Sequence, residues 1–66
     1  MKNDKNLEEY LEQWCLFNNP DNIYNFYKND KIIDKIKNKN EVIERYGEIK
    51  EFIVKISMGN VHVYVE

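Results

Sequence analysis

The chain has 66 residues, of which 33% are charged, and a formal net charge of −2. A chain of this length makes one domain, which we place at residues 1–66, and its thin margin of stability leads us to expect support from a partner. With one cysteine and one histidine, an internal disulfide and a zinc site built from these residues alone are excluded, and we expect no metal or cofactor.

The first predicted element is a helix that begins near Asn6. Asn6 and Glu9 form a capping-box pattern, and apolar residues follow at helical spacing. Cys15 lies on the same apolar face, which favours a buried structural thiol. The Asn-Asn-Pro run at residues 18–20 should end this helix.

Two further segments precede Gly47. Residues 20–28 predict a helix as first choice, with a short strand at Ile23–Tyr27 as the alternative, because the run is aromatic and β-branched. Residues 30–46 predict one kinked helix or two short ones, capped by Asn29-Asp30 and ended by Gly47.

A basic strip lies within these segments. Residues 28–39 carry five lysines and two aspartates, a net charge of +3, whereas the segments on either side are acidic. Such a strip is typical of a solvated helix face, and it would also suit contacts with phosphates. The candidate phosphate contacts are Lys31, Lys35, Lys37 and Lys39.

The last predicted element is a β-hairpin over residues 49–65, with its turn at Gly59-Asn60. This register places Ser57 opposite His62. One face is then apolar and should be covered by the helices, whereas the other is mixed and wet: Ile53, Lys55, Ser57, His62, Tyr64 and Glu66. Ile56 belongs to the apolar face, so replacing it by Ala should cost about 2–5 kcal/mol.

The predicted fold class is therefore α+β. Two to four short helices, within a helical region at 6–46, precede a C-terminal antiparallel β-hairpin at 49–65. The polar run Met1–Asn6 predicts no secretory leader, and no stretch is apolar enough to suggest a membrane span. With one unpaired cysteine, we expect a cytoplasmic protein.

The residues suggest binding rather than catalysis. A Ser57–His62 pair could suggest a nucleophile, but an exposed ribbon offers no pocket and no oxyanion donors, so we expect no enzyme. The aromatic residues exceed what so small a core needs, and aromatic side chains are frequent anchors of protein interfaces. The candidate partner-binding residues are Tyr10, Trp14, Tyr24, Tyr27, Lys55, His62 and Tyr64.

One stretch resembles a known family. Arg45–Val54, followed by Gly59–Val65, looks like the helix–strand–strand part of an RNA-recognition motif. Its Gly-Asn-Val-x-Val run is most similar to the variant in small splicing auxiliary factors, which binds peptides. The resemblance implies a first strand at Ile23–Tyr27 and a ligand that meets the hairpin face.

We expect a small protein-binding module, acting as a stoichiometric inhibitor or regulator and self-associating as a homodimer. The chain lacks Ala and Thr and holds ten Asn and nine Lys, a composition that indicates a low-GC genome: that of a bacterium, of its phages or of an AT-rich eukaryotic parasite. A phage or mobile-element accessory protein, located in the host cytoplasm and antagonising host defence, would fit. The alternative is a nucleic-acid-binding module, winged or partly like an RNA-recognition motif, that uses the Lys28–Lys39 strip and the hairpin.

Overall fold

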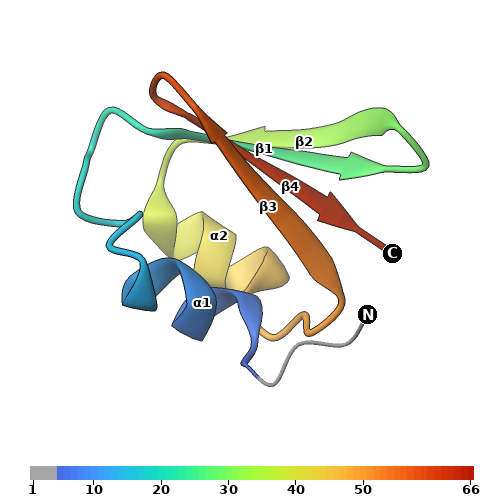
Figure 1. Ribbon diagram of the computed structural model, residues 1–66, viewed down its shortest axis with the longest axis horizontal. Coiled ribbons are helices and arrows are strands. Elements are labelled where there is room, and N and C mark those ends of the chain that lie inside the picture. Colours follow the sequence, from blue (N-terminus) through green and yellow to red (C-terminus); the bar gives the residue numbers. More distant parts are fainter. Residues whose placement is uncertain (1–4) are drawn as a thin grey trace.

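Two helices and four strands form two layers in the computed structural model, which describes residues 5–66 (Figure 1). The elements are α1 (Leu7–Gln13), β1 (Ile23–Lys28), β2 (Lys31–Ile36), α2 (Lys39–Tyr46), β3 (Phe52–Ser57) and β4 (Asn60–Val65). The α+β class is confirmed. The prediction of no secretory leader rests on the run Met1–Asn6, and residues 1–4 of that run lie outside the described residues.

The four strands form one mixed sheet in the order β2-β1-β4-β3. β1 and β2 pair antiparallel, as do β3 and β4, and the two hairpins meet where β1 and β4 pair in parallel. Figure 1 shows both helices on the same face of this sheet. The expectation that the strands would be limited to a C-terminal hairpin is therefore wrong.

The first hairpin replaces much of the helical region predicted over residues 6–46. The strand alternative at Ile23–Tyr27 is confirmed as β1, whereas residues 31–36 form β2 and only the part from Lys39 onward is helical. Asn29 and Asp30 have φ values of 53° and 64° and make the two-residue turn between the strands. Asn and Asp tolerate this left-handed backbone, so the pair marks a turn rather than a helix cap.

The second hairpin turns at Met58-Gly59, one residue before the predicted turn. These residues have φ values of 39° and 83°, and Ser57 pairs with Asn60 across the turn. Each β3 residue therefore faces a β4 residue two positions away from the predicted partner. Because side chains alternate with a period of two, this shift preserves both predicted faces.

The core lies between the helices and the sheet. α2 packs on β1 through Tyr46, whose ring stacks on that of Phe26 with centroids 3.9 Å apart. On β2, Asp34 accepts hydrogen bonds from Arg45 and Tyr46, both at 3.1 Å, and these bonds tie α2 to the sheet. The buried apolar residues are Leu7, Leu11, Leu16, Tyr24, Phe26, Ile36, Val42, Phe52, Val61 and Val63.

The predicted capping box at the start of α1 is confirmed by reciprocal hydrogen bonds between Asn6 and Glu9. Two more N–H groups of this helix end find partners in the α2–β3 loop, since Leu7 N donates to Ile49 O at 2.8 Å and Glu8 N to Gly47 O at 3.0 Å. The loop thereby satisfies donors that a helix start leaves unpaired, and it fixes α1 beside α2.

Gly47 ends α2 as predicted, but its φ of −58° is ordinary for a helix. A Cβ here would lie 2.4 Å from Ile43 O, so the close approach of the backbone explains the glycine.

Two residues expected in the core are exposed. Cys15 follows the end of α1 in a turn with a φ of 57°, which takes its thiol away from the helix face. Ile56 lies on the helix side of β3, but β3 is an edge strand, and 60% of the side chain is exposed. The expected cost of 2–5 kcal/mol for Ile56→Ala is therefore revised.

Within residues 5–66, neither helix has the length or the apolar character needed to cross a bilayer.

Replacing Ile56 by Ala should lower the free energy of unfolding by less than about 1 kcal/mol, because the side chain is mostly solvated. Leu11→Ala, at a fully buried position, should cost about 2–5 kcal/mol. Urea unfolding followed by circular dichroism measures both. Equal losses in the two variants would contradict the edge position of Ile56.

Stability should fall as the pH rises beyond about 10. Burial raises the pKa of Tyr24, and burial together with the hydrogen bond to Asp34 raises the pKa of Tyr46, both from 10.0. A pKa that is higher in the folded state gives stability that is complete below the unfolded value and is lost as the pH passes the folded value.

The measurement is the free energy of unfolding between about pH 8 and about pH 11. Tyr24→Phe and Tyr46→Phe should each reduce its fall with pH. An unchanged slope in both variants would show that these hydroxyls do not cause the alkaline loss.

Candidate functional site

The candidate site is the face of the sheet opposite the helices, here called the open face. Neighbouring side chains on a strand point to opposite faces. Phe26 contacts α2 through Tyr46, so Tyr27 points to the open face, and the pairing of β1 with β4 places Tyr64 beside it. Both helices lie on the other face of the sheet, and no described helix or strand lies over the open face (Figure 1).

One row of side chains crosses all four strands of the open face. Tyr27 pairs with Ile32 on β2 and with Tyr64 on β4, and Tyr64 pairs with Ile53 on β3. The Tyr27 and Tyr64 rings are stacked with centroids 4.7 Å apart and planes 17° apart. Ile32 and Ile53 are 53% and 63% exposed. We call these four residues the aromatic row.

A second row, the basic row, lies beside it and consists of Lys35, Asn25, His62 and Lys55. Its middle is polar but largely closed to water, since Asn25 is only 3% exposed and its amide donates to Asn60 Oδ1 at 3.3 Å. Its outer members, Lys35 and Lys55, are exposed. The basic row therefore places one cation on each side of a polar centre.

Two contacts connect the rows. Tyr27 Oη and His62 Nδ1 share a hydrogen bond of 3.0 Å. From the β3 side, Lys55 Nζ lies 5.5 Å from the centroid of the Tyr64 ring, within the range of a cation–π contact. These contacts hold the four side chains together as one surface.

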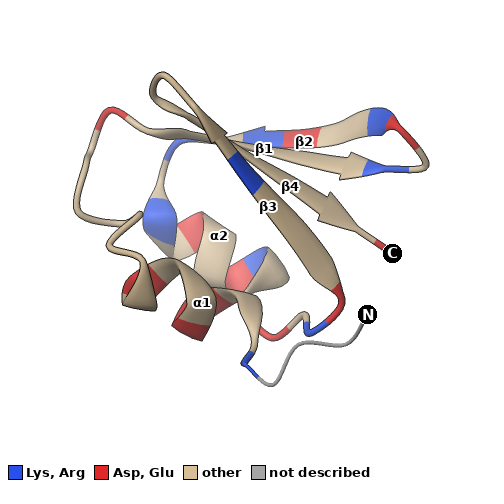
Figure 2. Cartoon of the chain, in the orientation of Figure 1, with Lys and Arg blue, Asp and Glu red and all other residues tan. Residues whose placement is uncertain are grey.

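The two layers carry opposite charge. The strands hold four lysines and one acidic residue, Asp34, which faces α2, whereas the helices hold five glutamates against Lys39 and Arg45. Figure 2 shows blue on β1, β2 and β3 and red on both helices, with further red on β2 and in several loops. The open face is therefore the less acidic side of the molecule.

Of the seven predicted partner-binding residues, the structure brings four together on the open face: Tyr27, Lys55, His62 and Tyr64. Tyr10 lies on α1 and Trp14 is its C-cap, both in the other layer, with ring centroids 6.2 Å apart, and Trp14 is 60% exposed. Tyr24 is a correction, because it is buried in the core and its hydroxyl donates to Leu16 O at 2.9 Å.

The predicted phosphate contacts are dispersed. Lys31 and Lys35 lie on β2, Lys37 in the loop after it, and Lys39 at the start of α2, where its Nζ is 5.9 Å from the Phe17 ring centroid. Interpreting the strip as a helix face is wrong, because strand and loop carry most of it. Lys35 is the member placed in the basic row.

Three members of the open face were not predicted from the sequence. Ile32 was placed inside a helix, Asn25 was given no role, and Ile53 was assigned to the wet face without being proposed for binding. The single polar residue in the otherwise apolar and aromatic run Ile23–Tyr27 was the signal available for Asn25. Ser57, in turn, faces Asn60 rather than His62, so the pair that suggested a nucleophile is not formed.

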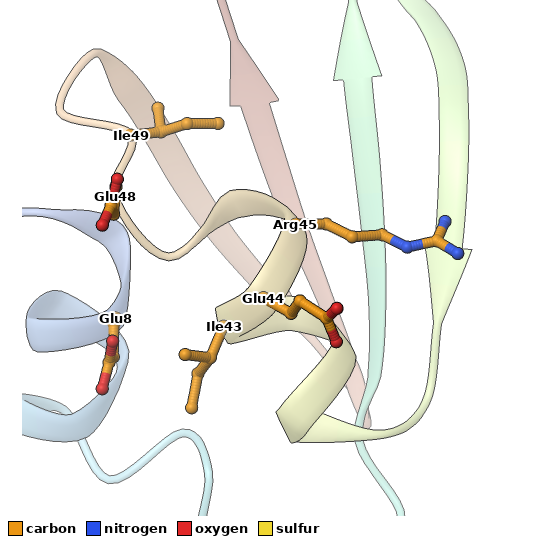
Figure 3. A pocket seen from close by; sticks show the side chains of 6 residues that line it. All are labelled: Glu8, Ile43, Glu44, Arg45, Glu48 and Ile49. Atoms are coloured by element: carbon orange, nitrogen blue, oxygen red, sulfur yellow. The ribbon is translucent and has the colours of Figure 1, made fainter.

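A hollow between the helices is the other notable surface feature. Figure 3 shows Glu8 from α1, Ile43 from α2 and Glu48 from the following loop on one side of it, while Glu44 and Arg45 extend away from α1. Within residues 5–66, no group of three His, Cys, Asp or Glu residues is arranged to hold a metal ion. The glutamates around the hollow are therefore not arranged to bind one metal ion together.

A scan against protein-family models, a search of curated proteins and a search of solved structures each return no match for this chain.

Proposed function

We propose that the chain is a non-enzymatic protein-binding module whose binding surface is the open face of its sheet. The observation that carries the proposal is the aromatic row, an apolar line across four strands that the helices leave uncovered. Its two isoleucines are more than half exposed, at 53% and 63%. Contiguous exposed apolar surface with a polar rim is typical of protein interaction sites.

The arrangement of the rings favours protein over nucleic acid. Proteins that stack nucleic-acid bases present the flat face of an aromatic ring to the ligand. Here one face of Tyr64 is taken by Tyr27 and the other side by Lys55. The Tyr64 ring is therefore not free to stack on a base, and the Tyr27 hydroxyl is already bonded to His62, so this pair suits contacts with side chains better than base stacking.

The basic row suggests the chemistry of the partner. Lys35 and Lys55 flank the polar centre, and the acidic residue on the strands faces the helices. Complementary charge steers association and suppresses wrong partners. A suitable partner surface would combine an apolar centre with carboxylates along one side.

A module of this kind acts by occupying a surface of its partner. Stoichiometric inhibition or regulation is therefore the mode of action that we propose. Self-association as a homodimer remains a prediction, and light scattering over a range of concentrations tests it.

The second candidate function is nucleic-acid binding. The observation in its favour is the excess of lysines on the strands and in the following loop (Figure 2). Contacts with phosphates do not need exposed ring faces, and they would give a strong dependence of affinity on salt.

Ile53→Asp should abolish capture of the protein partner from a lysate of the source cell, because it places a charge in the aromatic row. Met58→Asp is the matched control: it makes the same change in charge at a 97% exposed turn residue outside both rows. Capture followed by mass spectrometry, with and without nuclease, measures both.

The proposal predicts one stoichiometric protein that survives nuclease and is retained by Met58→Asp. Trp14→Asp extends the test to the α1 layer. Loss of the partner in Trp14→Asp with retention in Ile53→Asp would move the binding surface to the helices and contradict the proposal.

For the second candidate, the double variant Lys35→Glu/Lys37→Glu should weaken binding to single-stranded DNA or RNA and reduce its salt dependence, since two phosphate contacts are lost. Fluorescence anisotropy at several salt concentrations measures this. Binding that is undetectable in the wild type, or unaffected by the double variant, would eliminate this candidate.

A further inference from the structure

The two edges of the sheet differ in how they are protected. A bulge interrupts the pairing of β2 with β1 between Phe26 and Tyr27, and β2 carries three charged residues. β3 pairs with β4 without interruption, and Lys55 is its one charged residue. Bulges and charges are the usual means by which edge strands avoid further pairing. By these criteria β2 is protected against pairing with a further strand, and β3 is much less protected.

The register shows which backbone groups of β3 point outward. Ser57 and Asn60 flank the two-residue turn, so they form a hydrogen-bonded pair, and such pairs alternate with non-bonded ones along an antiparallel ladder. Ile53, Lys55 and Ser57 therefore bond toward β4. The N–H and C=O groups of Val54 and Ile56 point to the other side, beyond which no strand of residues 5–66 follows.

The side chains along this edge are apolar on both faces. Ile53 on the open face and Ile56 on the helix face are 63% and 60% exposed. An added strand would bury both, and it would extend the aromatic row, which ends at Ile53. The edge thus combines unsatisfied backbone groups with apolar surface, the combination used when an extended peptide adds a strand to a sheet.

The charge of Lys55 distinguishes two candidate occupants of this edge, a second copy of the chain and a strand that carries an acidic residue. Antiparallel pairing of two copies through Val54 and Ile56 of each would place Lys55 directly opposite Lys55 of the second copy. Like charges directly opposite each other are destabilising, whereas opposite charges stabilise a cross-strand pair. Lys55 therefore disfavours this self-pairing and favours a strand that carries an acidic residue.

We infer that the β3 edge binds an extended acidic segment of the protein partner, which adds to the sheet as a further strand. The segment bonds to the backbone of Val54 and Ile56, places a carboxylate opposite Lys55 and sets an apolar side chain beside Ile53. This inference rests on the proposed function and specifies the chemistry of the partner at one side of the open face.

The test uses two blocked peptides of about seven residues, in which Val and Thr alternate around a central Glu or a central Lys. Titration of the isotope-labelled full chain, followed by amide chemical shifts in NMR, gives the affinity of each peptide. The Glu peptide should bind about three- to tenfold more tightly than the Lys peptide. The amides of Val54 and Ile56 should shift and gain protection from hydrogen exchange.

Two variants at exposed lysines form a matched pair. Lys55→Glu should reverse the preference, so that the Lys peptide binds more tightly. Lys28→Glu makes the same change at an exposed lysine of β1 that lies outside both rows, and it should retain the preference for the Glu peptide. Equal affinity of the wild type for the two peptides, or no reversal in Lys55→Glu, would overturn the acidic specificity.

Ile56→Pro tests the backbone contact, because it removes an outward N–H that β4 does not use, and proline is tolerated on edge strands in this position. It should abolish binding of both peptides while the amide spectrum of β1 and β4 stays native. The absence of shifts at Val54 and Ile56 in the wild type would overturn the edge as the site. Protection of these amides that grows with protein concentration, without peptide, would overturn it in favour of a second copy.

Capture of the cellular partner by the variants distinguishes this inference from the proposed function. A partner whose capture is lost in Ile53→Asp but unaffected by Ile56→Pro and Lys55→Glu would leave the open face as the binding surface and overturn the added strand. Loss in all three variants supports both.

Discussion

The parallel ladder between β1 and β4 joins two hairpins, separated in the chain by α2, into one sheet. This pairing makes β1 and β4 the central strands, and the layer beneath them holds Phe26 and Val63, both fully buried. The same ladder sets Tyr27 beside Tyr64 on the open face. Because side chains alternate along a strand, one set of backbone bonds organises the core on one side and the candidate site on the other.

The helices complete the structure on one face and leave the other exposed. α1 is held by its capping box and by two N–H groups that donate to the α2–β3 loop, and α2 is held by the Tyr46–Phe26 stack and the bonds to Asp34. Most of the acidic residues in secondary structure belong to these helices. The open face thus combines apolar and basic side chains, and we interpret this polarity as the basis of binding.

Local signals in the sequence predicted the α1 cap, the end of α2 at Gly47 and both faces of the second hairpin. The first hairpin was missed because Asn29-Asp30 suits a helix cap as well as a turn, and the surrounding residues fit either spacing. The parallel pairing of β1 with β4 could not be predicted, because it joins residues far apart in the chain. The second hairpin alone was enough to select Lys55, His62 and Tyr64 as candidates. Their position beside Tyr27 and Ile32 on one face depends on the β1–β4 pairing.

A nuclear Overhauser spectrum of the aromatic side chains tests whether the β1–β4 pairing creates one covered face and one open aromatic face. We expect strong cross-peaks between the rings of Tyr27 and Tyr64, and separately between those of Phe26 and Tyr46. Cross-peaks from Tyr27 to α1 or α2, or no cross-peaks between Tyr27 and Tyr64, would show instead that β1 presents its other face to the helices or does not pair with β4.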